Sequence, residues 1–214
     1  MSTTTLPTGI VARAKAILTA PAATWPAIAA EPDSVAGLYT GYIAILAAIT
    51  PLATFIHGVV FGYGAMGFSY HPSFFSALST AIVTYLFTLA GTFVMAVIIA
   101  ALAPTFQGQN NQLQALKLVA YAATASWLAG IFNLLPGLGI LALLGLYSLY
   151  LFYIGLPVLM QSPPEKSLPY TLVIFVAAIV VGVVVSFTAS FLTGGAPYGR
   201  MADGSISFPS RIWR

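Results

Sequence analysis

The sequence predicts an all-α polytopic membrane protein, a bundle of five transmembrane helices with an N-terminal interfacial amphipathic helix. Composition is the first observation behind this prediction. Of the 214 residues, 59% are hydrophobic and only 5% are charged, and the mean hydropathy is +0.96. A soluble domain carries about 25% charged residues. This chain therefore has too few charges to cover a surface that faces water.

The second observation is a series of apolar windows, each long enough to cross a bilayer core of about 30 Å. The third is that the linkers between these windows are short and contain Gly, Pro and polar residues, which end helices. No internal repeat is apparent, so an inverted-repeat transporter is not supported. We expect one transmembrane domain over 37–193, with spans at about 37–61, 74–102, 115–133, 137–160 and 169–193.

The segment before the first span, residues 1–36, is expected on the cytoplasmic side or in the interface. Several apolar residues recur there at helical spacing, whereas Arg13 and Lys15 leave the apolar face. This pattern is typical of a short helix in the headgroup region, and a partly ordered tail is the alternative. Arg13, Lys15 and Trp25 are predicted to be interfacial anchors. Residues 194–214 are expected to form a C-terminal tail.

The basic residues set the expected orientation. Arg13, Lys15, Lys117 and Lys166 would lie on the side of the N-terminus, and the three remaining arginines would lie opposite. The two loops on the N-terminal side hold lysines, whereas the two opposite loops hold no Lys or Arg. By the positive-inside rule, we expect the N-terminus in the cytoplasm.

The second span carries a row of hydroxyls, with one at every fourth residue from Ser76 through Thr80, Thr84 and Thr88 to Thr92. Residues four apart in a helix form one slowly turning seam. The seam could be the polar wall of a cavity or ion path. The other interpretation is a helix-packing surface, because hydroxyls in membrane helices bond back to preceding carbonyls and small residues permit close approach. The packing interpretation is favoured.

Two kinds of ionisable residue border the membrane. Lys117 opens the third span, with Tyr121 and Thr124 on the same helix face. A lysine there is expected to extend to the headgroups, and a place in a ligand pocket is the alternative. His57 and His71 have no carboxylate near them in sequence, so they are predicted to be interfacial rather than metal-binding.

The fourth span contains three tyrosines spaced by three, Tyr147, Tyr150 and Tyr153. The set climbs about 9 Å, which is too tall for one aromatic belt, so at least one hydroxyl needs an internal partner. Pro157 cannot donate to the carbonyl of Tyr153, which leaves that oxygen as a candidate acceptor. Asn133 and the hydroxyls of the second span are others. We interpret the cluster as a kinked, hydrogen-bonded packing ridge, with a ligand pocket as the alternative.

Most catalytic chemistry is not supported. The chain has no cysteine, and all four acids lie outside the predicted spans. No intramembrane carboxylate can relay protons, and no metalloprotease, serine-hydrolase or phosphate-loop motif occurs. The few scattered basic residues make no nucleic-acid footprint. We therefore expect no enzyme, no cofactor, no metal site and no nucleic-acid partner.

Three stretches resemble the Yip family of five-span membrane proteins. They are RAKAILTAPAATWPAIAAEPDS (13–34), LKLVAYAATASWLAGIFNLLPGLGIL (116–141) and GLYSLYLFYIGLPVLMQSPPEKSLPYTL (145–172). Ser126 departs from the pattern, because many relatives have a proline there. The resemblance implies a bacterial inner-membrane protein with a cytoplasmic N-terminus. The eukaryotic branch interacts with Rab GTPases, and that property is not carried over to this chain.

The expected function follows from many packing features and little chemistry. We expect a non-enzymatic membrane protein that acts through contacts with the lipid bilayer, with other membrane proteins, or with its own copies as a homo-oligomer. It would be an accessory subunit, an assembly factor or a membrane-organising scaffold. The alternative is a small transporter or channel with a polar intramembrane cavity.

Overall fold

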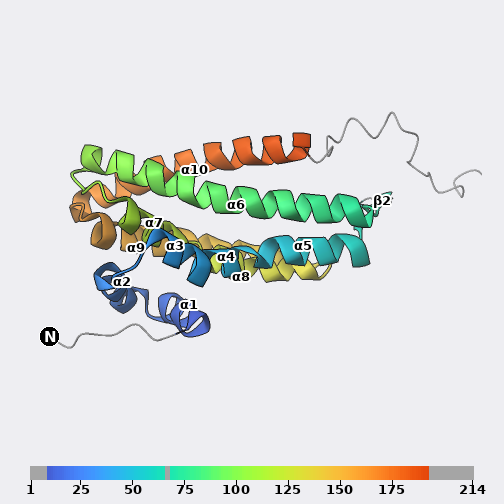
Figure 1. Ribbon diagram of the computed structural model, residues 1–214, viewed down its shortest axis with the longest axis horizontal. Helices are drawn as coiled ribbons and strands as arrows, with labels where there is room; N and C mark the ends of the chain where they lie inside the picture. The colour runs from blue at the N-terminus through green and yellow to red at the C-terminus, as the bar shows by residue number, and fades with distance from the viewer. Residues whose placement is uncertain (1–8, 66–67, 193–214) are drawn as a thin grey trace, which may run out of the picture.

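The computed structural model describes residues 9–65 and 68–192, and its architecture is a helical bundle with one short hairpin (Figure 1). Five helical stretches are long and apolar enough to cross a membrane, which confirms the predicted fold class. Each begins or ends within a few residues of its expected bounds. They cover Val35–Val60, Phe74–Phe106, Gln112–Leu134, Leu138–Met160 and Pro164–Leu192. The predicted tail, 194–214, lies outside the described residues.

Two helices precede the bundle instead of the single one expected. They are α1 (Ile10–Thr19) and α2 (Pro21–Ala30). The chain turns at Ala20, whose φ of −140° and ψ of 57° leave the helical region, and Pro21 then occupies the first position of α2. Both helices lie along one side of the bundle, near the end where the first span begins (Figure 1).

The first span is divided, because the helix changes its winding and then breaks. Its parts are α3 (Val35–Leu38), the π-helical η1 (Tyr39–Ile43), α4 (Ala44–Ala47) and α5 (Ile49–Val60). Pro51 sits in the first turn of α5, where its missing N–H costs little.

The hairpin that follows the first span joins β1 (Tyr63–Ala65) to β2 (Phe68–Tyr70) in antiparallel register. The chain then enters α6 (Phe74–Leu102), whose N-cap Ser73 accepts a hydrogen bond from the Ser76 amide. A 3₁₀ turn, η2 (Ala103–Phe106), ends this span.

The third and fourth spans are also segmented. The third consists of α7 (Gln112–Ala122), α8 (Thr124–Ala129) and the 3₁₀ helix η3 (Gly130–Leu134). The fourth consists of the 3₁₀ helix η4 (Leu138–Leu146) and α9 (Tyr147–Met160), and α10 (Pro164–Leu192) forms the fifth.

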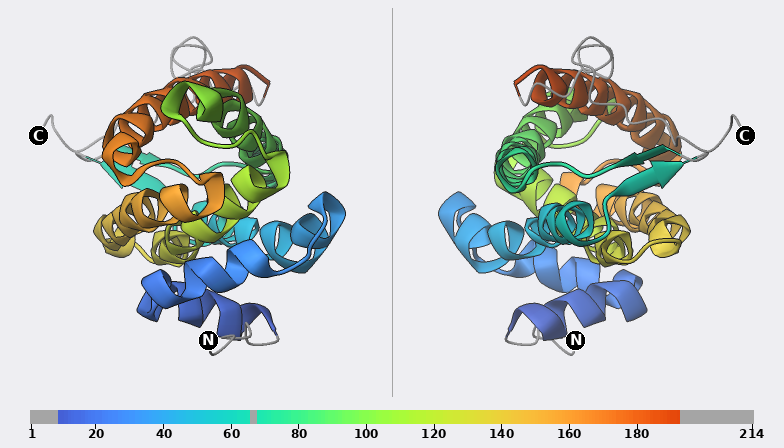
Figure 2. Two further views of the ribbon diagram at one scale, coloured as in Figure 1. Left: turned by 90° about the vertical axis from the view of Figure 1, so that its left-hand side faces the viewer. Right: turned by 90° about the vertical axis from the view of Figure 1, so that its right-hand side faces the viewer.

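Burial is uneven along the bundle. In Figure 1, α6 and α10 lie on one side, with α5, α8 and α9 on the other, and Figure 2 shows the same arrangement along the bundle axis. The third span is the most enclosed. In its 18-residue apolar stretch 67% of the residues are buried, whereas in the corresponding stretch of α10 only 6% are buried. The core therefore centres on α7, where it meets α2, α9 and α6. Its largest fully buried side chains include Trp25, Leu116, Leu118, Tyr121, Leu151, Leu156 and Tyr170.

Candidate functional site

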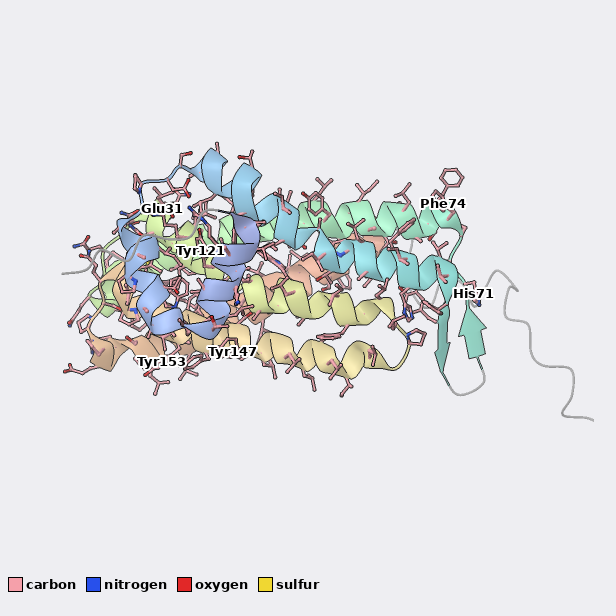
Figure 3. All side chains as sticks on the ribbon, turned by 90° about the horizontal axis from the view of Figure 1, so that it is seen from below. Glu31, His71, Phe74, Tyr121, Tyr147 and Tyr153 are labelled. Carbon is pink, nitrogen blue, oxygen red and sulfur yellow. The ribbon has the colours of Figure 1, made fainter. Side chains whose placement is uncertain are left out.

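Polar side chains from α1, the end of α2 and α7 meet at the end of the bundle where the first span begins. We call Arg13, Glu31, Lys117 and Tyr121 the junction cluster. Arg13 donates from Nη1 to Glu31 Oε2 at 2.9 Å and to the Tyr121 hydroxyl at 2.9 Å, and its Nη2 forms an ion pair with Glu31 Oε1. Glu31 and Tyr121 lie at this end in Figure 3, with His71 and Phe74 at the other.

The guanidinium of Arg13 is held in its charged form. Partial burial disfavours that form, but the hydrogen bonds to Glu31 and Tyr121 outweigh burial, so the pKa of Arg13 is raised above its ordinary value. Arg13 was expected to be an interfacial anchor. It instead makes a bidentate pair within the protein, while Lys15 is exposed.

Lys117 lies inside the protein rather than extending to the headgroups as expected. Its side chain is only 2% exposed, and Nζ donates to the carbonyl of Ile28 at 2.9 Å and to that of Glu31. Gln114, one turn earlier in α7, donates from Nε2 to the carbonyl of Ala29 at 3.0 Å. The last carbonyls of a helix have no intrahelical donor and carry partial negative charge. Lys117 and Gln114 together cap the C-terminus of α2.

A second polar contact connects the first and third spans beside the junction cluster. The hydroxyls of Tyr42 and Thr124 are 2.7 Å apart, and the rings of Tyr42 and Tyr121 have centroids 4.5 Å apart. Tyr42 and Thr124 are both buried, so this hydrogen bond is shielded from solvent and lipid. It links η1 to α8.

Trp25 was also expected to be an interfacial anchor, and that expectation is corrected. Its side chain is 0% exposed and lies against α9, where Gly155 leaves room for the indole. A Cβ at Gly155 would lie 2.5 Å from Cε2 of Trp25 and 2.9 Å from a methyl of Leu118. The ring also meets Tyr121 edge-on, with centroids 6.5 Å apart. Trp25 therefore attaches α2 to the core.

A polar cavity of about 320 Å³ opens next to the junction cluster. Its charged lining residues are Arg13, Glu31 and Asp33, and Tyr42 and Tyr121 form part of its wall. The remaining lining residues are apolar or lack a side chain, namely Gly9, Ile10, Pro32, Gly37, Leu38 and Gly41. This is the place in the described chain where charge, hydroxyls and open space coincide.

The three tyrosines of the fourth span lie apart from this cavity. Tyr147, Tyr150 and Tyr153 are 37%, 51% and 41% exposed. Tyr147 donates to the carbonyl of Leu18 in α1 at 3.2 Å, and its ring lies 5.4 Å from that of Tyr150. This partner belongs to the N-terminal helices, which were not among the acceptors expected. Pro157 lies within the same helix.

Asn133 lies elsewhere, in η3 near the turn between the third and fourth spans. Three hydroxyls of the second-span row bond back within their own helix, and the first of these, Thr80, donates to the carbonyl of Ser76 at 2.9 Å. Thr88 donates to the carbonyl of Thr84 at 2.8 Å, and Thr92 donates to that of Thr88 at 2.8 Å. These three hydroxyls therefore have hydrogen-bond acceptors without leaving their own helix.

A second cavity, of about 190 Å³, lies between α6, α7, α9 and α10 and is lined mainly by apolar side chains. Its hydroxyls already have partners. Ser126 and Ser148 are 2.8 Å apart, and Thr171 donates to the carbonyl of Ser167 at 2.7 Å. This lining is suited to an apolar occupant and offers no row of free polar groups to an ion.

Comparison with known proteins identifies a family and two related proteins. The model of the Yip1 domain matches residues 15–186. The inner membrane protein YohC of Escherichia coli strain K12 is 27% identical over 146 residues, which cover 66% of this chain and 75% of that protein. YohC of Escherichia coli O6:H1 matches with the same identity and coverage. No solved structure matches the chain significantly.

Proposed function

This chain belongs to the Yip1 domain family, and from that premise we propose a non-enzymatic function in the bacterial inner membrane, exerted through protein or lipid contacts within the bilayer. Its role is that of an accessory subunit, an assembly factor or a membrane-organising scaffold. The five apolar spans support this placement, as does the description of the Escherichia coli relatives as inner membrane proteins.

The observation that carries the proposal is the outer face of α10. This helix has 29 residues, and only 6% of its apolar window is buried against the rest of the protein. Gly182, Ser186 and Ser190 recur on it at spacing of four and are all exposed. A shallow depression runs over them, lined by α10 residues alone. We call these three residues the small face.

Small residues at spacing of four let membrane helices approach closely, and such faces are enriched at helix–helix contacts. Lipid tails gain no comparable packing from a small face, because they adapt to any apolar surface. The small face therefore supports contact with another helix, either from a second copy of this chain or from another membrane protein.

Single-cysteine crosslinking tests this proposal, because the chain has no cysteine of its own. Ser186→Cys, labelled with a thiol-reactive benzophenone and irradiated in native membranes, is expected to give one adduct of fixed mass. Val184→Cys is the matched control, because Val184 is exposed on the same helix but points about 160° away. Equal yields from the two positions, or no discrete adduct from Ser186→Cys, would contradict the proposal.

We also propose that the N-terminus lies in the cytoplasm, in agreement with the distribution of lysines. Thr19 is exposed at the end of α1, so Thr19→Cys reports the location of this segment. A membrane-impermeant maleimide is expected to label it only after the inner membrane is opened. Labelling in intact spheroplasts would show that the N-terminus lies on the opposite side of the membrane.

A further inference from the structure

The polar cavity concentrates charge in a chain that has very little. The sequence contains seven basic and four acidic residues, and half of those acids, Glu31 and Asp33, line this one cavity together with Arg13. Charged side chains near a membrane are costly unless they are paired or serve a ligand. The ion pair between Arg13 and Glu31 accounts for two of the three charged lining residues, whereas Asp33 forms no ion pair among the described residues.

The position of the cavity across the membrane can be judged from the length of the bundle. The 29 residues of α6 extend roughly 44 Å, which exceeds a hydrocarbon core of about 30 Å. The ends of the bundle therefore reach the headgroup region. The cavity is lined by Gly37 and Gly41 near the start of the first span and by residues that directly precede it, Glu31 and Asp33. We therefore expect the cavity to lie at the level of the lipid headgroups.

The lining favours a group that carries a positive charge. Both carboxylate oxygens of Glu31 accept from Arg13, which neutralises that pair. Asp33 accepts from the backbone amide of Ser34 through Oδ1, but it forms no ion pair among the described residues. The three charged lining residues therefore carry a net formal charge of −1, and the buried Lys117, outside the lining, interacts electrostatically with Asp33.

The same cavity also offers donors to an anion. Three of the five N–H groups of Arg13 are used in its bonds to Glu31 and Tyr121, and two remain without a partner among the described residues. A ligand with an ammonium group and a phosphate a few bonds apart would match Asp33 and Arg13 at once. The volume of about 320 Å³ lies within the range of roughly 300–1,000 Å³ that is typical of small-ligand sites.

We propose that this cavity binds the headgroup of an aminophospholipid, a phosphoethanolamine, with its ammonium on Asp33 and its phosphate beside Arg13. A primary ammonium donates three hydrogen bonds, whereas a choline headgroup donates none and is bulkier. A glycerol headgroup on an anionic lipid brings no positive charge to Asp33. The site therefore selects ethanolamine lipids over both. This inference deepens the lipid side of the proposed function.

Native mass spectrometry of the full chain, released from nanodiscs with equal amounts of phosphatidylethanolamine, phosphatidylglycerol and phosphatidylcholine, tests the selection. The wild type is expected to retain phosphatidylethanolamine preferentially. Asp33→Asn is expected to reduce that preference about fivefold, since it removes the carboxylate charge that would hold the ammonium. Glu165→Gln is the matched control, because Glu165 is an exposed acid outside the cavity, and it should leave the preference unchanged.

A second variant fills the cavity with a larger side chain instead of removing a charge. Beyond the adjacent backbone of its own helix, no atom of the described residues lies within 4 Å of the position that a Cβ would take at Gly41, so Gly41→Leu would project into the opening without a clash at its Cβ. It is expected to abolish the preferential adduct while the protein remains folded, as shown by an unchanged melting temperature. An unchanged preference in Asp33→Asn, or preferential retention of phosphatidylglycerol by the wild type, would overturn the inference. Failure of the Ser186→Cys crosslink would overturn the helix-contact proposal alone, because the two readouts are independent.

Discussion

Substituting Gly155 with alanine tests how firmly α2 is attached to the fourth span. The added Cβ would lie 2.5 Å from Cε2 and 2.7 Å from Cζ2 of Trp25, and 2.9 Å from a methyl of Leu118. Ordinary contacts between carbon atoms are about 3.5–4.0 Å, so the indole would have to move by roughly 1 Å. Trp25 is 0% exposed, so its ring cannot relieve the contact by moving a short way into solvent or lipid.

The expected loss of stability follows from two opposing effects. Overpacking a well-packed core costs about 1–3 kcal/mol. Alanine in a helix interior is more favourable than glycine by about 0.5–1 kcal/mol, which offsets part of that cost. We therefore expect Gly155→Ala to lower the free energy of unfolding by about 1 kcal/mol, and by at most about 2.5 kcal/mol. For a chain of this size, each kcal/mol corresponds to a fall in melting temperature of roughly 2–4 °C.

Thermal unfolding of the purified protein in detergent micelles measures the change. Gly91→Ala in α6 is the matched control, because a Cβ there would meet no atom within 4 Å in the described part of the chain other than the backbone next to it, and it should raise the melting temperature slightly. Trp25→Phe, which shortens the aromatic ring system, should reduce the additional cost of Gly155→Ala in the double variant. If Gly155→Ala is as stable as Gly91→Ala, the close packing of α2 on α9 is wrong.

Two further predictions concern the N-terminal helices. Lys117→Met removes both hydrogen bonds from Nζ and leaves carbonyls of α2 unsatisfied, at a cost of roughly 1–3 kcal/mol. Proteinase K should then cleave the segment before the first span faster than it does in the wild type. The control is Lys15→Met, which changes an exposed lysine and should be cleaved more slowly than Lys117→Met. Equal cleavage rates would contradict the capping role. Tyr147→Phe removes the bond to the carbonyl of Leu18 and should cost about 0.5–1.5 kcal/mol, whereas Tyr150→Phe should change stability by less than about 0.5 kcal/mol. The melting temperatures of the two variants check this, and the opposite order would refute it.

Part of the candidate site could be predicted from the sequence. Lys117 and Tyr121 were identified because a lysine and a tyrosine on one face of an apolar helix are unusual. Their partners were not, because Arg13 and Tyr121 are 108 residues apart and nothing local couples them. Glu31 and Tyr42 were missed for the same reason. One signal in the sequence could have pointed to Glu31. The chain has only four acidic residues, so each of them is a candidate partner for a basic residue such as Arg13.

Trp25 shows why an interfacial pattern was misleading. A tryptophan beside prolines ahead of the first span has the sequence signature of a membrane-interface anchor. The same residue is suited to a buried contact if another helix offers a glycine opposite it, as Gly155 does. Composition near the chain start cannot distinguish these environments, because the distinguishing residue lies in the fourth span.

The sequence by itself determined the membrane class, the five spans and their approximate ends. The reason is physical, since the bilayer imposes a length and an apolar composition on each span separately, and both are local properties. Only the tertiary structure decided which polar groups meet, how α1 and α2 attach, and where the charged cavity opens. Those outcomes depend on which helix faces pack together. Many pairings are compatible with the same apolar pattern, because hydrocarbon is present on every side and hydrophobicity alone does not select a partner.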